Sequence, residues 1–419
     1  MNISVLTLLF AGLAIIGSVE AQVNLDTLQL VQVLFRHGER VPEYAYPTDP
    51  YNSESQWKEG WGQLTEVGKK QEFELGRYLR SRYQTYISDN FVPNEIYTLS
   101  SDTDRTIMSA ELCLAGIFPT ENGTEWNPDL KWQPIPLHVI PEVYDNILRC
   151  KKKCPKFEEE LRHELYNSPE MKQLNSDNQQ LFEYLSNNSG VAISNIDDID
   201  RFWATMMVEE LLGLPLPSWA VPVVHTDNFQ YMYNLSMAIK SSTLELKRLR
   251  TGPLLDSINS HFHERMSNAS SKTKLYIYSA HDTTIVNLLN SLDIFDLQIP
   301  RYSSIVMMEL HKTLDTNNYF ISFSFRNDTQ REPYKLKLPI CELDCPYEEF
   351  TKFVEPMIPQ DWDAECQLEP APSNTEVNPI VHYFIAGGVG LLLLGFAYFL
   401  LSKVLCKKKS QDQEGYEKF

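Results

Sequence analysis

Short hydrophobic runs alternate with polar segments at three places along the chain. The runs are LQLVQVLF (28–35), EIYTLS (95–100) and KLYIYSA (274–280), and they are followed by RHGER, SDTDR and HDTT. Apolar runs of this length with polar boundaries are typical of buried β-strands. The segments TIMSAELCLAGIF and IVNLLNSL, which come after SDTDR and HDTT, predict helices. The pattern therefore indicates an α/β fold with a central sheet.

The three polar segments are expected to meet at one site. In open α/β sheets, ligands bind beyond the carboxyl ends of the strands, and each polar segment begins where a predicted strand ends. A simpler interpretation of SDTDR is that Asp102 or Asp104 only caps the helix that follows. If the segments do converge, the site contains Arg36, His37, Arg40, Arg105, His281 and Asp282.

The middle of the chain has a different pattern. Residues 131–235 contain few strand candidates, whereas KKKCPKFEEELRHELY, NQQLFEYLSNN and IDRFWATMMVEELLGL indicate helices. We interpret this stretch as a helical cap that covers one face of the sheet. It is inserted into an α/β domain formed by residues 22–130 and 236–367.

The N-terminus predicts entry into the secretory pathway. Residues 1–21 hold a short apolar stretch ending in VEA, which is typical of a signal peptide cleaved after Ala21; an N-terminal membrane anchor is the alternative. Sequons in the region that follows predict glycosylation at Asn122, Asn187, Asn234, Asn268 and Asn327. The same region has an even number of cysteines, which suggests disulfides among Cys113, Cys150, Cys154, Cys341, Cys345 and Cys366. The spacing CELDC could close a small loop, but spacing alone does not give the other pairs.

The C-terminal part predicts a membrane anchor. Residues 380–402 are long and apolar enough to form a single transmembrane helix, and the lysines that follow place the tail, residues 403–419, in the cytosol. Residues 368–379 form a polar, proline-containing stalk. Cys406 lies beside the membrane, where it is either a palmitoylation site or a free thiol. The chain is thus expected to be a type I membrane glycoprotein.

The charge narrows the classes of partner. A net charge of -19 argues against nucleic acid, because phosphate backbones bind basic surfaces. Such an acidic surface suits a protein that must stay soluble in an acidic compartment. A site containing three arginines would be a local exception to this charge.

The candidate site residues fit phosphoryl chemistry. Planar guanidinium groups suit phosphate oxygens, so Arg36, Arg40 and Arg105 indicate a phosphate ligand. His37 could attack phosphorus and form a phosphoenzyme, and the arginines lower its pKa and favour its neutral form. Asp282 is the candidate general acid, because a bound dianion should raise its pKa. Together these roles predict an acid optimum.

At these residues the chain resembles a known family. LFRHGERVP, GQLTEVGKKQEFELGRYLRSRY, LSSDTDRTIMSAELCLAGIFP and YSAHDTT are similar in order and spacing to motifs of the histidine acid phosphatases. Within that family, the chain most resembles the group of lysosomal and prostatic acid phosphatases. The resemblance covers nearly all of the predicted lumenal part, from about residue 25 to residue 367.

The resemblance implies a fold, an activity and residue roles. The fold is a three-layer α/β domain with a smaller helical domain, often as a homodimer, and the activity is hydrolysis of phosphate monoesters without metal or cofactor. His37 is implied as the nucleophile and Asp282 as the proton donor. The implied phosphate ligands are Arg36, Arg40, Arg105 and His281. The implied disulfides are Cys154–Cys366 and Cys341–Cys345, with Cys113 and Cys150 less clearly matched.

The tail sequence suggests a destination. GYEKF contains Tyr416 and Phe419 as a Tyr-x-x-apolar signal, which is similar to the tails of lysosomal members of that family. It predicts recognition by sorting adaptors and a location in the lysosomal membrane. The alternative is an ecto-phosphatase that stays at the cell surface.

Other functions stay open at the level of the sequence. One is a narrow-specificity phosphatase for inositol phosphates or lysophospholipids, and the predicted cap would decide its substrate. Another is a catalytically silent membrane glycoprotein that binds a partner. A phosphotransfer like that of phosphoglycerate mutases fits less well, because the predicted topology separates the domain from cytosolic metabolites. The presence of all six candidate site residues argues against the silent glycoprotein.

Overall fold

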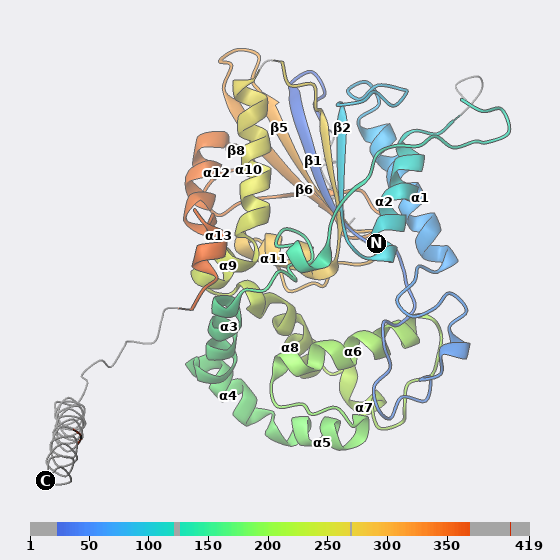
Figure 1. Ribbon diagram of the computed structural model, residues 1–419, viewed down its shortest axis with the longest axis vertical. Helices are drawn as coiled ribbons and strands as arrows, with labels where there is room; N and C mark the ends of the chain where they lie inside the picture. The colour runs from blue at the N-terminus through green and yellow to red at the C-terminus, as the bar shows by residue number, and fades with distance from the viewer. Residues whose placement is uncertain (1–22, 121–125, 269, 369–402, 404–419) are drawn as a thin grey trace, which may run out of the picture. The chain divides into compact units, whose positions relative to one another are not determined.

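A mixed β-sheet forms the centre of the computed structural model, which describes residues 23–120, 126–268, 270–368 and Lys403 (Figure 1). Its strands follow the order β3 (His138–Ile140), β2 (Ile96–Ser101), β4 (Leu275–Ala280), β1 (Leu28–Arg36), β5 (Ile305–Lys312), β6 (Tyr319–Arg326) and β7 (Tyr334–Leu336), with β8 (Asp344–Pro346) also paired to β6. Strands β3, β2, β4 and β1 are parallel, whereas the pairings from β1 to β5 and onward are antiparallel. The predicted α/β fold with a central sheet is confirmed.

The three strands predicted from the sequence are neighbours in this sheet. They are β1, β2 and β4, and each agrees with its predicted run to within one residue at either end. Because they are parallel and adjacent, their carboxyl ends meet at one edge of the sheet. The polar segments that follow them therefore begin side by side.

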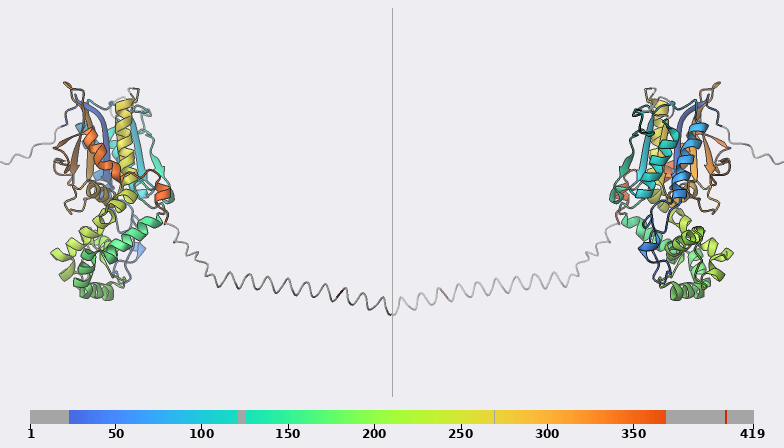
Figure 2. Two further views of the ribbon diagram at one scale, coloured as in Figure 1. Left: turned by 90° about the vertical axis from the view of Figure 1, so that its left-hand side faces the viewer. Right: turned by 90° about the vertical axis from the view of Figure 1, so that its right-hand side faces the viewer.

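Helices cover both faces of the sheet (Figures 1 and 2). On one face are α1 (Glu66–Arg82) and α2 (Asp104–Ile117); on the other are α10 (Gly252–Ser267), α11 (Asp282–Ser291) and α12 (Tyr347–Val354). Alternate side chains of β1 serve the two layers: Leu30 and Leu34 pack toward α10 and α11, and Val33 and Phe35 pack toward α1 and α2. Burial on both faces explains why this strand is apolar at nearly every position.

A helical region packs at the carboxyl ends of the parallel strands. It contains α3 (Pro155–Asn167), α4 (Pro169–Asp177), α5 (Gln179–Ser189), α6 (Ile196–Leu211), α7 (Val221–Val224) and α8 (Asp227–Ala238), and α9 (Leu244–Arg250) leads back to α10. Its core is separate and rich in aromatic residues, among them Phe202, Trp203 and Phe229. The predicted cap begins earlier, at residue 131, yet β3 lies in that stretch and belongs to the sheet. Three residues on an exposed edge strand leave no hydrophobic run to reveal it. The division into two domains stays a prediction.

One disulfide joins distant parts of the chain, and another joins two cysteines that are close in sequence. Cys154, at the start of α3, is bonded to Cys366, which follows α13 (Trp362–Glu365). Cys341 is bonded to Cys345. Cys113 is buried in α2 and Cys150 is partly buried, and neither thiol is in a disulfide. The structure thus contains both pairs that the resemblance implies.

The predicted glycosylation sites lie in different settings. Asn268 is exposed at the end of α10. Asn187 and Asn234 lie within helices, and the serines that complete their sequons are fully buried. Asn327 is half-buried, and its side-chain oxygen accepts a hydrogen bond from the Arg301 N–H. Glycosylation stays a prediction at all of these positions.

Several predictions concern residues outside the described part of the chain. They are the signal peptide (1–21), Asn122, the stalk after Leu368, the membrane segment (380–402), Cys406 and the sorting residues Tyr416 and Phe419. The chain divides into the units Met1–Gln367 and Leu368–Phe419. Among the described residues, no helix combines the length and the apolar character that crossing a membrane requires.

Candidate active site

All six predicted site residues line one cavity at the carboxyl ends of β1, β2 and β4. Arg36 is the last residue of β1, and His37 and Arg40 follow it in the loop to α1. Arg105 lies in the first turn of α2, after β2, and His281 and Asp282 join β4 to α11. The cavity has a volume of about 340 Å³, and α6 and α8 of the helical region form its other wall. The expected convergence of the three polar segments is therefore present.

The alternative interpretation, in which SDTDR only caps the following helix, is wrong about the capping residue. The N-cap of α2 is Thr103, not Asp102 or Asp104. Asp102 instead accepts a hydrogen bond from the Glu142 N–H, and Asp104 accepts one from Gln63. The segment both starts the helix and directs Arg105 into the cavity.

The nucleophile candidate, His37, has a fixed tautomer. Its Nδ1 lies 2.9 Å from the Gly38 carbonyl oxygen, so Nδ1–H must donate to that oxygen. Nε2 therefore carries the lone pair. Gly38 packs so closely on α1 that a Cβ there would collide with the Gly68 carbonyl. Glycine at this position lets the loop lie directly against the helix.

The surroundings of His37 favour its neutral form. Its side chain is buried, and burial is the main cause that lowers its pKa well below the usual value. Repulsion from Arg105 and Arg36 lowers the pKa further. A neutral imidazole with a fixed lone pair is what a nucleophile needs at acid pH. The lowering that the sequence predicted for the free site is confirmed in direction.

The arginines offer unused hydrogen-bond donors. The Nε atoms of Arg36, Arg40, Arg105 and Arg149 are buried and have no hydrogen-bond partner among the described residues. Buried polar groups are normally hydrogen-bonded, so a cluster of such donors indicates a site for an oxyanion. Burial together with repulsion from Arg40 and Arg149 lowers the pKa of Arg105 to about 10, against the opposing effect of Glu43.

Asp282 is an ion-paired carboxylate in the ligand-free site. Its Oδ2 lies 2.7 Å from Arg36 Nη2, and Oδ1 accepts a hydrogen bond from the Thr283 N–H. Burial alone would raise its pKa, but Arg36, the Thr283 N–H and Arg40 outweigh burial and lower it. Arg36 also donates to the Pro300 carbonyl and stacks over the Tyr302 ring, so its position is fixed from several sides.

His281 contacts Arg149, a residue that the sequence did not single out. Arg149 Nη1 lies 3.3 Å from His281 Nδ1. Arginine can only donate, so Nδ1 accepts, and Nε2–H donates to Ser101 Oγ at 2.9 Å. His281 therefore directs no N–H into the cavity in this arrangement. A role as phosphate ligand requires Arg149 to move and the proton to shift to Nδ1.

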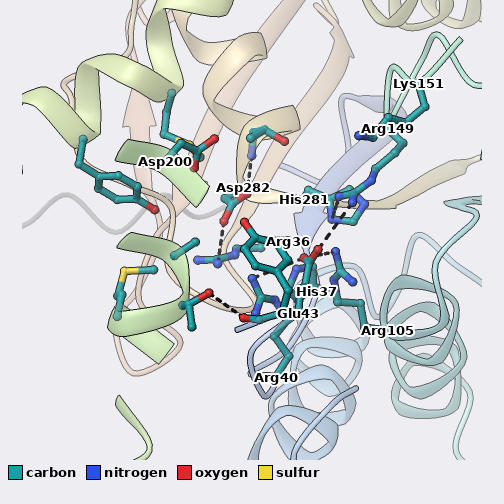
Figure 3. A pocket seen from close by; sticks show the side chains of 17 residues that line it. Arg36, His37, Arg40, Glu43, Arg105, Arg149, Lys151, Asp200, His281 and Asp282 are labelled. Carbon is teal, nitrogen blue, oxygen red and sulfur yellow. Dashed lines mark hydrogen bonds and ion pairs between the residues drawn. The ribbon is translucent and has the colours of Figure 1, made fainter. Parts of the chain in front are cut away.

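Several residues that line the cavity were not predicted from the sequence (Figure 3). They include Glu43 from the β1–α1 loop, Arg149 and Lys151 from the segment before α3, and Asp200 from α6. The basic run RCKKK was a usable signal in so acidic a chain, whereas nothing local distinguishes Glu43 from other acidic residues. Among the described residues, no group of three or more His, Cys, Asp or Glu side chains could hold a metal ion.

Known proteins are similar to this chain in sequence. Residues 27–326 match the histidine phosphatase superfamily (branch 2). The chain is 36% identical over 384 residues to the lysosomal acid phosphatase of Bos taurus, with 90% of this chain and 89% of that protein covered. It is 37% identical over 353 residues to the prostatic acid phosphatase of Homo sapiens, covering 83% and 90%.

A solved structure supports the fold. The ligand-free phytase of Hafnia alvei matches with a TM-score of 0.60 at 17% identity, covering 82% of this chain and 98% of that one. At that identity the likeness concerns the fold alone. From the family match and the two acid phosphatase relatives, the chain belongs to the histidine phosphatase superfamily (branch 2) and is a phosphoric monoester hydrolase.

Proposed function

We propose that this enzyme hydrolyses phosphate monoesters at acid pH through a phosphohistidine formed on His37 Nε2. The observation that supports this most directly is the hydrogen bond from Nδ1–H to the Gly38 carbonyl, because it leaves the Nε2 lone pair available inside a cavity lined by arginines. Arg36, Arg40 and Arg105, joined by Arg149, hold the phosphoryl oxygens. Charge-assisted hydrogen bonds from guanidinium groups offset the charge of the transferring group.

The reaction has two steps. In the first, Nε2 attacks phosphorus, the P–N bond forms as the P–O bond to the alcohol breaks, and Asp282 gives the leaving oxygen a proton. In the second, Asp282 takes a proton from water, whose oxygen attacks phosphorus while the P–N bond breaks. Inorganic phosphate leaves and His37 returns to its neutral state. The same carboxyl group thus acts first as an acid and then as a base.

Asp282 needs a proton that the free site does not give it, because its pKa is lowered there. A monoester phosphate has a second pKa of about 6, so at lower pH the substrate arrives as a monoanion carrying a proton. Its oxygens also compete with Asp282 for Arg36, which weakens the ion pair that keeps the carboxyl group charged. Turnover should therefore fall as the pH rises above about 6.

The test compares the purified full-length enzyme with the variant His37→Ala on an aryl phosphate between pH 4 and 8, with and without a chelator. We expect chelator-resistant turnover that peaks at acid pH, and a loss of more than about 1,000-fold in the variant. Rapid acid-free quenching with ³²P-labelled substrate should trap label on His37. Undiminished turnover in His37→Ala, or label on another residue, would overturn the mechanism.

We also propose that the helical region from α3 to α8 acts as the cap over this site. Asp200 and Met207 from α6 and Tyr233 from α8 line the same cavity as His37, so they are candidates for contact with the leaving alcohol. Exchanging these three side chains should change the preference among phosphate esters more than the hydrolysis of a small aryl phosphate. Equal effects on every ester would argue against a role in selection.

For the location, we propose the lysosomal membrane, with the enzyme domain in the lumen and the tail toward sorting adaptors. This rests on the predicted membrane segment and tail signal, and on relatives named lysosomal acid phosphatase in Bos taurus and Homo sapiens. Tyr416→Ala should move the protein to the cell surface in fixed-cell imaging. An unchanged distribution would show that Tyr416 does not direct the sorting of the protein.

A further inference from the structure

One carboxylate lies among the arginines of the active site. Glu43 Oε1 is 2.6 Å from Arg105 Nη2 and 3.5 Å from Arg40 Nη2, and its Oε2 is 3.9 Å from Arg149 Nη2. Figure 3 shows the Glu43 side chain reaching into the cluster from the β1–α1 loop. Its two oxygens occupy the place where three guanidinium groups converge, which is how an oxyanion ligand would be bound.

The position of Glu43 creates a conflict with substrate. The guanidinium edge of Arg105 that points to Glu43 cannot donate the same N–H groups to a phosphoryl oxygen. A phosphate placed beside Glu43 would also face a like charge. Glu43 comes from a loop and its side chain is about one-quarter exposed (28%), whereas the Arg40 and Arg105 side chains are 9% and 7% exposed. The carboxylate is therefore the more easily displaced partner.

We propose that Glu43 is a displaceable internal anion, which competes with phosphate for Arg105 and Arg149 and so limits the affinity of the site for substrate and product. The inference rests on the proposed role of the arginines as phosphate ligands. Its consequence is fast release: when inorganic phosphate leaves, Glu43 returns to the arginines and takes its place. The enzyme would then tolerate higher phosphate concentrations than the arginine cluster alone would allow.

The competition persists at acid pH. Burial favours the protonated form of Glu43, but Arg40, Arg105 and Arg149 outweigh burial and lower its pKa below the usual value. The arginines thus favour the charged form of Glu43 in the acid range in which the enzyme is expected to work. Protonation of Glu43 is not needed for its displacement, because an incoming phosphate carries at least one negative charge.

The experiment measures binding of inorganic phosphate to full-length wild-type enzyme and to Glu43→Gln by titration calorimetry at pH 5. Glutamine keeps the shape of the side chain but removes the charge. The variant loses the charge-assisted hydrogen bonds between Glu43 and the arginines, so phosphate no longer has to displace them. We therefore expect phosphate to bind about 10- to 100-fold more tightly to the variant than to the wild-type enzyme. Inhibition of turnover by phosphate should strengthen in parallel.

The matched control is Glu142→Gln. Glu142 also faces Arg149, at 3.7 Å from its Nε, but it is more exposed and does not line the cavity. We expect its phosphate affinity to stay within about twofold of the wild type. Glu43→Asp keeps the charge on a shorter side chain and should bind phosphate with an affinity between those of the wild type and Glu43→Gln. If Glu43→Gln does not fold, tighter phosphate binding by Glu43→Asp than by the wild type tests the same inference.

Unchanged or weaker phosphate binding in Glu43→Gln would overturn the inference and would make Glu43 a structural partner that holds the arginines in place. Phosphate binding does not require turnover. A failure of the phosphohistidine mechanism, seen with His37→Ala, is therefore distinguishable from a failure here.

Discussion

At the scale of single residues, the acid–base role of Asp282 depends on Arg36. The Arg36–Asp282 contact of 2.7 Å keeps the carboxyl group charged in the free enzyme, against the effect of burial. Any ligand that draws Arg36 toward itself raises the pKa of Asp282. Substrate binding and protonation of the general acid are therefore coupled through one guanidinium group, which the positions of the two residues in the sequence did not reveal.

This coupling gives a prediction for Asp282→Asn. The variant should lose about 10²–10⁴-fold in the first turnover of an alkyl phosphate, because an alkoxide needs a proton to leave. A nitrophenyl phosphate should lose much less, since nitrophenolate leaves without one. Single-turnover kinetics at pH 5 on both esters would measure the ratio. Equal losses on the two esters would show that Asp282 acts by positioning Arg36 instead.

At the scale of elements, the features that depend on local sequence were predictable, and those that depend on long-range packing were not. The strands were predictable because β1, β2 and β4 are short apolar runs, and six residues of the cavity were predictable because they lie at or shortly after the ends of these strands. Glu43 and Arg149 were missed because long-range packing of irregular segments brings them into the cavity. The predicted cap boundary missed β3 for the same reason, since its pairing with β2 is tertiary.

Another long-range pairing joins the β1–α1 loop to α6 through two buried carboxyl groups. Asp49 of the loop is 2% exposed, and Glu209 of α6 is fully buried. The Tyr51 N–H donates to Asp49 Oδ1, but neither carboxyl oxygen of Glu209 receives a donor from elsewhere in the described residues. Burial, and then the nearby Asp49, raise the pKa of Glu209 to about 8, so this pair holds a proton at acid pH.

The pair predicts how stability changes with pH. The folded-state pKa of Glu209 is about 8, above the ordinary value of 4.5. Its contribution is therefore fully present below pH 4.5 and is lost as the pH rises toward 8, at up to about 1.4 kcal/mol per pH unit. Compared with wild type, Glu209→Gln should be more stable at pH 7 and nearly equal at pH 5, as measured by urea unfolding.

The control for this prediction is the neighbouring, exposed Glu210. Glu210→Gln should leave the pH dependence of unfolding close to that of the wild type. Buried histidines such as His37 and His281 have lowered pKa values and act in the opposite direction, but they are common to all three proteins and cancel in the comparison. Identical pH curves for the two variants would contradict the proton-sharing pair.

At the scale of the whole molecule, an acidic chain builds a cationic site by bringing arginines from separate segments together. The formal charge of -19 describes the chain as a whole, while Arg36, Arg40, Arg105 and Arg149 converge at the ends of three parallel strands. The polar segments predicted three of these arginines. Spacing left the disulfide partners open, because Cys154 and Cys366 meet only through the packing of α3 against the end of the enzyme domain.

That disulfide gives the last prediction. Cys154–Cys366 closes a loop with a sequence separation of 212, whereas Cys341–Cys345 closes one with a separation of 4. In the chain-entropy account, the longer loop restricts the unfolded state more, so Cys366→Ser should lower the free energy of unfolding by about 3–5 kcal/mol. Cys345→Ser, the matched control, should cost clearly less. Chemical denaturation at pH 5 would measure both, and an equal or larger loss in Cys345→Ser would show that local packing around the small loop, and not chain entropy, dominates.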